Sequence, residues 1–314
     1  MDTNTALSAK GAWQIKAPVP GARSHTPPAV YGGKIYVFGG GGPAFASMNS
    51  VYAYDPARDS WKACAPMPTH RSGTVSVVVG DYIYVMGGGF KQANGQFRFL
   101  TKVEIYHPPT DAWETGPDLL QPHDYPAVAL LDHAIYVLGG HHPDATTGGP
   151  KTDPGFDFCE RLDLDTGKWS TIAPLSQPRF ALSAVTADGK ILALGGVAFT
   201  TEGFNNFTLV ESYDPATNQW QREDRYTLPW PAAGQASCTL GGYLYLFGGY
   251  STDNIHARAA RLNLSGGVWE RLPDMPAPRA AMGLTVLDET IYLIGGWADD
   301  GRTPQDSVFA YTVS

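Results

Sequence analysis

The chain is poor in cysteine and in charge. Only three of its 314 residues are cysteine, Cys64, Cys159 and Cys238. Their odd number and wide spacing exclude a disulfide framework and a CxxC zinc pattern. Charged residues make up 17%, and 22 basic against 30 acidic residues give a net charge of −8. Binding to nucleic acid depends on clustered Lys and Arg, so this composition excludes a nucleic-acid partner.

Long apolar runs are also lacking. A membrane-spanning helix needs about 20 apolar residues, and the longest candidate, residues 74–86, is interrupted by Gly80 and Asp81. The first twelve residues have neither a basic segment nor an apolar segment, so no signal peptide is expected. We therefore expect a soluble, cytoplasmic protein with no membrane partner. The oligomeric state is not indicated.

Turn-forming residues, by contrast, are abundant. Glycine (36) and proline (25) together make up roughly a fifth of the chain, against about 12% in an average protein. Aromatic residues make up 12%. This composition favours many short strands joined by tight turns.

One unit of about 51 residues recurs six times. A Gly-Gly pair marks each copy, at 39–40, 87–88, 139–140, 195–196, 248–249 and 295–296. A tryptophan precedes each pair by 26 residues, or by 28 in the fifth copy: Trp13, Trp61, Trp113, Trp169, Trp220 and Trp269. Such regular spacing predicts a repeat architecture.

Each unit is predicted to form four antiparallel strands. An apolar strand and a tight turn, such as Asp132-His133, lead to a second strand that ends in Gly-Gly. A third strand ends at residues such as Tyr54 and Tyr213, and in five units the tryptophan of the fourth strand follows seven residues later. The sixth unit ends before its tryptophan, whereas Trp13 has no third strand before it. We therefore expect the N-terminal strand to complete the last sheet and close a ring.

These motifs resemble kelch repeats. Gly-Gly after an apolar strand, then Tyr213-Asp214-Pro215, then Trp220, shows the pattern, and the resemblance covers residues 11–314. It implies an all-β, six-bladed kelch β-propeller as a single domain, preceded by a flexible tail at residues 1–10. The family includes partner-binding modules and unrelated enzymes, so the resemblance implies no single function.

The order of the strands in each unit determines which loops emerge on which face of the ring, and this indicates the face that carries a site. Loops that join strands two and three, and loops that join one unit to the next, vary in length and emerge on the same face, around the mouth of the central channel. Three positions per unit are expected there. One is the residue directly after the Gly-Gly pair, and the other two lie 14 and 16 residues before the first glycine of the pair. The predicted ligand-binding residues are Arg23, His25, Arg71, Phe90, Arg179, Phe180, Tyr250, Arg279 and Trp297.

The four arginines leave two interpretations open. Arginine binds carboxylates and phosphates well, which favours an anionic ligand over the channel. Alternatively, the arginines hold the blades through Glu104, Glu160 and Glu211 of the third strands. The aromatic residues of the variable loops are likewise open to two interpretations, as ligand contacts or as loop packing.

The third unit departs most from the repeat. It carries His123 and Tyr125, then His141 and His142, then an insertion at residues 143–158 with several carboxylates. Histidine is an acid–base group near neutral pH, so we consider these four residues catalytic candidates. A polar surface loop explains them as well. No metal-binding motif is present, and we expect neither a metal nor another cofactor.

Two functions follow as hypotheses. In the first, the propeller binds a peptide or a small anionic ligand at the variable-loop face. In the second, it is an enzyme that acts on a small molecule, as the resemblance to mutarotases and epimerases implies, with the third-unit histidines as acid and base.

Overall fold

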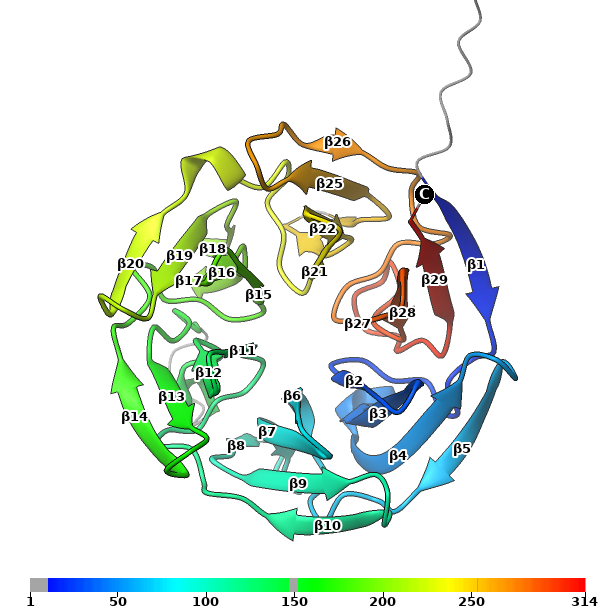
Figure 1. The fold of residues 1–314 in the computed structure, drawn as a ribbon. Coiled ribbons are helices and arrows are strands. Elements are labelled where there is room, and N and C mark those ends of the chain that lie inside the picture. The colour runs from blue at the N-terminus through cyan, green and yellow to red at the C-terminus, as the bar shows by residue number, and fades with distance from the viewer. Residues whose placement is uncertain (1–10, 147–151, 253, 314) are drawn as a thin grey trace, which may run out of the picture.

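The structure is a computed structural model that describes residues 11–146, 152–252 and 254–313. Its strands form six blades around a central axis, each with four antiparallel strands in radial order and the outermost strands at the rim (Figure 1). The sheet of the second blade has a fifth strand. The predicted six-bladed propeller is therefore confirmed. The predicted tail at residues 1–10 lies outside the described residues.

The first three blades follow one another along the chain. From the axis outward, their strands are β2 (Pro28–Tyr31), β3 (Lys34–Gly41), β4 (Ser47–Asp55) and β5 (Ser60–Cys64); β6 (Ser72–Val79), β7 (Tyr82–Lys91), β9 (Val103–His107) and β10 (Ala112–Thr115); and β11 (Ala127–Leu131), β12 (Ala134–Leu138), β13 (Cys159–Asp163) and β14 (Lys168–Ile172). The turn between β11 and β12 has positive φ at Asp132 and His133, as a tight hairpin of this twist requires.

The last three blades repeat this order. Their strands are β15 (Ser183–Ala187), β16 (Lys190–Leu194), β19 (Val210–Asp214) and β20 (Gln219–Arg222); β21 (Ala236–Leu240), β22 (Tyr243–Phe247), β25 (Ala259–Asn263) and β26 (Glu270–Arg271); and β27 (Gly283–Leu287), β28 (Thr290–Ile294), β29 (Val308–Thr312) and β1 (Ala12–Lys16).

The N-terminal strand closes the ring, as predicted. Strand β1 pairs antiparallel with β29, so Trp13 lies opposite Tyr311, and their ring centroids are 4.8 Å apart. The two ends of the described chain thus meet in one sheet (Figure 1). This pairing covers an edge of β29 that would otherwise be open.

The six repeat tryptophans join neighbouring blades. Each indole N–H donates to a main-chain carbonyl that follows the outer strand of the preceding blade, at 2.8–3.0 Å. The acceptors are Pro273, Ala17, Ala65, Pro117, Ala173 and Thr227. The tryptophans are half-buried rather than fully buried.

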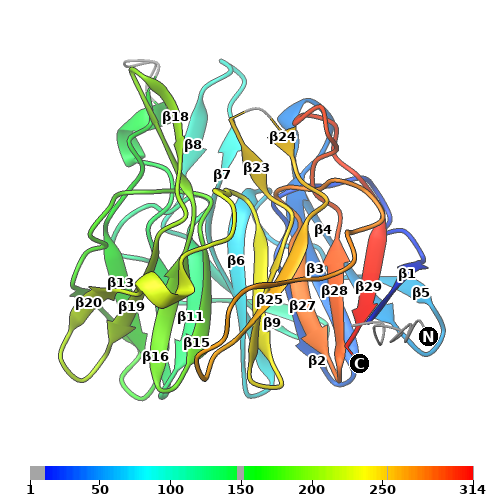
Figure 2. The ribbon, with the colours of Figure 1, turned by 90° about the horizontal axis from the view of Figure 1, so that it is seen from above.

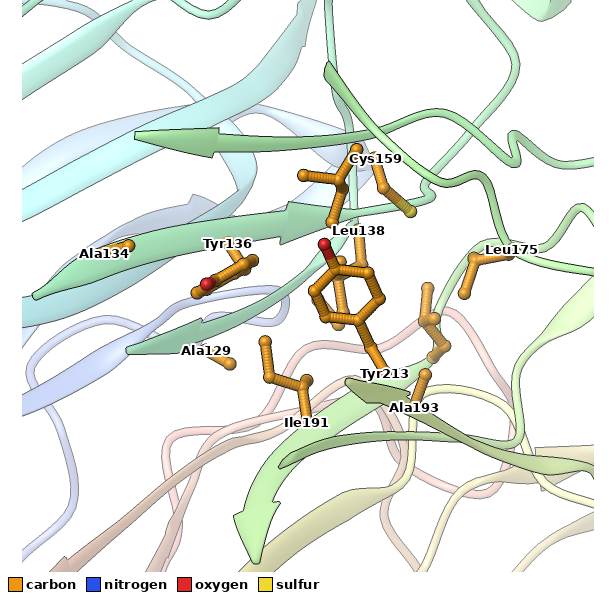
Figure 3. Close-up of a cluster of buried hydrophobic side chains, with 12 residues drawn as sticks. Ala129, Ala134, Tyr136, Leu138, Cys159, Leu175, Ile191, Ala193 and Tyr213 are labelled. Carbon is orange, nitrogen blue, oxygen red and sulfur yellow. The ribbon is translucent and has the colours of Figure 1, made fainter. Parts of the chain in front are cut away.

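The core lies between blades. Between the third and fourth blades, Tyr136 and Cys159 face Ile191 and Tyr213, with Leu175 at the outer side of the cluster (Figure 3). These side chains are buried, and burial of this apolar area stabilises the contact between the sheets.

A ring of main-chain hydrogen bonds surrounds the axis. One residue at or just before the start of each inner strand has positive φ: His25, Gly73, Tyr125, Ala181, Gly234 and Ala281. The N–H of each donates to the carbonyl oxygen of its counterpart in the preceding blade, at 2.7–3.2 Å, and the bond from His25 to Ala281 closes the cycle. The ring fixes the distance between neighbouring blades at the channel mouth.

Three hairpins rise above one face of the propeller. They are formed by β7 with β8 (Phe97–Phe99), β17 (Val197–Thr200) with β18 (Gly203–Asn206), and β23 (Tyr250–Ser251) with β24 (Asn254–Ile255) (Figure 2). Three short 3-10 helices, η1 (Pro43–Phe45), η2 (Pro143–Thr146) and η3 (Asp224–Tyr226), complete the described elements. No helix in the described ranges is long and apolar enough to cross a membrane.

Removing residues 1–16 tests the ring closure. The deletion takes away β1, its pairing with β29 and the Trp13 contacts, so we expect the thermal transition to lose cooperativity or to fall by on the order of 10 °C. Calorimetry measures this, with removal of residues 1–10 as the control. Equal melting of the two truncated proteins would contradict closure by β1.

Candidate functional site

A cavity lies at the channel mouth, on the face with the three hairpins. Its volume is about 570 Å³, and a contiguous second cavity has about 700 Å³. The two cavities share the residues His25, Tyr125, His141, Asp153, Phe199 and Trp297. This volume is in the range of small-molecule sites.

His25 and Tyr125 form the floor. Both residues also line the channel segment below, so their rings stand at the boundary between cavity and channel. The ring of His25 meets those of Tyr125 and Trp297 edge-on, each at a centroid distance of 4.4 Å. His25 and Tyr125 both have positive φ, which is unfavourable for bulky residues and is concentrated at functional sites in proteins.

Two glycines at equivalent positions make room for this floor. A β-carbon on Gly234 would lie 2.7 Å from the hydroxyl oxygen of Tyr125, and one on Gly73 would collide with the carboxylate of Asp124. Tyr125 therefore extends from the third blade to the fifth. The carboxylate of Asp124 lies over the second blade.

His141 and two carboxylates are the polar centre of the cavity. His141 Nδ1 lies 2.5 Å from Asp153 Oδ2, and His141 Nε2 lies 3.9 Å from Asp124 Oδ2. Asp153 Oδ1 also accepts hydrogen bonds from the main-chain N–H groups of His142 and Gly155. The imidazole is stacked on the ring of Phe180, with centroids 4.0 Å apart. These contacts fix the position of His141.

The environment shifts the pKa of each of these groups. Burial lowers the pKa of His141, but the hydrogen bond with Asp153 and the charges of Asp124 and Asp153 outweigh it, so that the pKa is raised. Burial raises the pKa of Asp124 to about 7, against the effect of His141. Burial raises the pKa of Asp153, but the hydrogen bond with His141, the charge of His141 and the main-chain hydrogen bonds together outweigh it, so that the pKa is lowered. His25 is neutral, because burial, followed by the charge of His141, lowers its pKa to about 3.

The insertion of the third blade supplies Asp153. Its backbone pairs with Phe199 of the β17–β18 hairpin through N–H to carbonyl bonds of 2.7 and 2.6 Å. Further along the insertion, Phe156 and Phe158 stack on each other and lie 5.5 and 6.0 Å from the ring of His123. These ring contacts hold the end of the insertion against His123.

Aromatic side chains form the walls. They come from five blades and from the loops above them: Phe45, Phe97, Phe99, Phe180, Phe199, Phe204, Tyr250 and Trp297. Phe45 and Phe204 remain 41% and 50% exposed, at the rim. The aromatic residues of the variable loops thus also pack against one another, for example Phe199 with Phe204 at 4.7 Å.

The expected ring of arginines over the channel is corrected by the structure. Arg23, Arg71 and Arg179 are fully buried and Arg279 is 7% exposed, so they turn into the blades. Arg71 pairs with Glu104 at 2.9 Å and Arg179 with Glu211 at 2.6 Å. This is the alternative in which third-strand carboxylates hold the arginines.

The other two arginines have uncharged partners. Arg23 donates to the carbonyl oxygens of Pro20 and Gly39 and to Ser50. Arg279 donates to Ser307 and to the carbonyl oxygen of Pro278. None of the four is among the described residues that line the two cavities.

His123 is a structural counterpart of these arginines rather than a residue of the cavity. It is fully buried; its Nδ1 donates to the carbonyl oxygen of Gly139 at 2.6 Å and its Nε2 lies 3.0 Å from Glu160. Of the other predicted residues, His142 lies beside Asp144, and neither His142 nor Phe90 is among the described lining residues.

The remaining predicted residues are brought together. His25, Tyr125, His141, Phe180, Tyr250 and Trp297 all line the cavities. Asp124 and Asp153 were not predicted as site residues. Asp124 is recognisable afterwards, because it directly precedes the left-handed ring position of its blade. Asp153 lies in an insertion without repeat register, so no spacing in the sequence indicates it.

The arrangement is suited to proton transfer and to binding of polar groups. An imidazole oriented by a carboxylate can take or give a proton at its other nitrogen. Within the described ranges, no three His, Cys, Asp or Glu side chains lie together so as to hold a metal ion.

Comparisons with known proteins agree with this architecture. The six blades with their repeated Gly-Gly and Trp define a kelch-type β-propeller. A family profile described as attractin/LZTR1 beta-propeller matches residues 8–256, and one described as kelch motif matches residues 278–314. The chain belongs to the attractin/LZTR1 beta-propeller family.

Individual relatives are more distant. The chain is 29% identical to Kelch-like protein terF of Aspergillus terreus over 64% of its own length and 46% of that protein. It is 29% identical to Kelch-like protein 36 of Rattus norvegicus over 87% of its length and 44% of that protein. It thus spans less than half of these curated relatives. The solved structure of YjhT superposes with a TM-score of 0.79 at 18% identity, covering 94% of this chain and 96% of that one, and shows the fold alone.

Replacing Arg71 by alanine tests its structural role. The change leaves the buried carboxylate of Glu104 without its cation, so we expect the free energy of unfolding to fall by about 3–5 kcal/mol. The matched control is Arg58→Ala, which removes an exposed pair with Asp55 and is expected to cost less than about 1 kcal/mol. Denaturant unfolding measures both. Equally small losses would contradict the assignment.

Proposed function

We propose that this kelch propeller binds a ligand, a small molecule or a short peptide segment, in the aromatic cavity at its channel mouth. One observation carries the proposal. The cavity is large enough for such a ligand, and its walls are aromatic around a few convergent polar groups. Kelch propellers are generally scaffolds for protein interactions, which supports a peptide as the ligand.

The charge of the cavity changes the expected ligand. An anionic ligand was expected because of the four arginines, but these are buried in the blades. The cavity instead holds Asp124 and Asp153 around His141. We therefore do not retain the preference for an anion. A cytoplasmic location stays a prediction.

The proposal is tested by a binding screen. Ligand-observed NMR with a mixture of small molecules and short peptides identifies binders, and Trp297→Ala is expected to weaken them at least tenfold because it removes a wall. The control is Tyr82→Ala, a change at an exposed tyrosine that begins β7. Binders that respond equally to both changes, or the absence of any binder, would contradict the proposal. Melting temperatures show that both variants fold.

A second candidate function is proton transfer on the bound molecule, as in an isomerase. It is favoured by the contact of His141 with Asp153 and by Asp124 on the other side of the imidazole. In this function His141 Nε2 is the acid or base, and the hydroxyl of Tyr125 stays protonated because burial raises its pKa well above the usual value.

This candidate requires a chemical change. For each molecule that binds, NMR spectra over several hours show conversion by the wild-type protein, and His141→Gln is expected to lower its rate about 100-fold or more while affinity changes little. A wild-type protein that leaves every bound molecule unaltered would exclude proton transfer on that set. Asp165→Asn, a change at an exposed carboxylate far from the cavity, is the control.

A further inference from the structure

Resting on the proposed function, we propose that the mouth cavity selects a ligand that carries an organic cation, such as an ammonium group. The chemistry of the lining carries this inference. The described residues that line the first cavity include no lysine or arginine. Besides Tyr125 of the floor, five of them are aromatic: Phe45, Phe97, Phe99, Phe199 and Trp297. Aromatic faces attract ammonium groups, and a nearby carboxylate strengthens this attraction.

The charge of His141 does not compensate the cavity's acidity. His141 Nδ1 lies 2.5 Å from Asp153 Oδ2, so these two groups form a pair with no net charge when the imidazole is protonated. The rings of Phe99 and Phe180 stack on His141, at 5.7 and 4.0 Å, and cover its faces. The imidazolium is therefore already held by protein groups.

Asp124 is the group left for a ligand. Its carboxylate is 13% exposed, and its nearest basic atom is His141 Nε2 at 3.9 Å, beyond hydrogen-bond distance. The groups that face it from the neighbouring elements are His141, Asp153, His25 and Tyr125. Of these, His25 and Tyr125 are uncharged at neutral pH. The side chain of Arg98, on the adjacent hairpin, lines a separate recess.

The rim continues the acidic character. In the second cavity, Asp299 and Asp300 flank Arg302, and all three are exposed. Asp300 is a carboxylate at all ordinary pH values, because hydrogen bonds from Thr303 lower its pKa to about 2. An approaching cation thus meets more negative than positive charge.

Binding of a cation is linked to a proton. Burial keeps Asp124 protonated in part of the molecules at pH 7, and a cation next to it favours the ionised form. The proton is released to solvent on binding. Affinity for the cation is therefore expected to rise between pH 6 and pH 8, while an uncharged ligand has no such dependence on Asp124.

The test uses a matched pair of probes. Choline and 3,3-dimethylbutan-1-ol have the same shape and differ in the charged nitrogen, and NMR titration of the protein gives both dissociation constants. We expect choline to bind at least tenfold more tightly at pH 8, with a smaller ratio at pH 6. Asp124→Asn is expected to bring the ratio close to one, whereas the control Asp165→Asn leaves it unchanged. A lysine-containing pentapeptide titrated in parallel distinguishes a cation carried by a peptide from a small free ammonium ion, by which of the two binds more tightly.

The outcomes separate this inference from the proposed function. Equal affinity for both probes or no binding of choline overturns the selection of a cation. A ratio that survives Asp124→Asn overturns the assignment of this selection to Asp124. If the alcohol or an anionic probe such as benzenesulfonate then binds and Trp297→Ala weakens it, the ligand cavity stands without the cation. Melting temperatures of the asparagine variants establish that a lost ratio does not result from unfolding.

Discussion

The cycle of six main-chain hydrogen bonds around the axis is the constraint on which the rest of the propeller depends. Each blade contributes one left-handed residue, whose N–H and carbonyl groups are both used in the cycle. Because the donors and acceptors belong to the backbone, any residue that can adopt positive φ can occupy these positions. Glycine and alanine occupy four of the six positions, and the two bulky exceptions, His25 and Tyr125, form the floor of the cavity.

Adjacent residues just before an inner strand differ in where their side chains lie: one is buried in the blade, and the next ones face the cavity. In the third blade, His123 turns inward to Glu160, whereas Asp124 and Tyr125 face the cavity. In four other blades a buried arginine takes the inward position, and in the fifth blade Ala232 takes it. A buried charge needs its partner, so this position stabilises the entry of the chain into the blade. The two residues that follow can change without loss of that contact, and they give each blade its contribution to the site.

The repeat determined how much of the structure could be predicted. Spacing alone indicates six blades, closure by the N-terminal strand and the face with the variable loops, because these properties depend on period and parity. The same counting placed His25, His141 and Trp297 at the mouth. It misplaced Arg71 and His123, because a position near the mouth does not tell whether a long side chain turns outward or toward a carboxylate such as Glu104. Asp153 depends on the path of an insertion, which has no period.

The third blade offers a further consequence. Its histidine at the inward position contacts Phe156 and Phe158, and these rings hold the end of the insertion that brings Asp153 to His141. Four residues of one blade, the tripeptide at 123–125 and the histidine at 141, thus join the anchoring of a loop to the polar chemistry of the cavity, so a change at the buried His123 is felt at a cavity that it does not line.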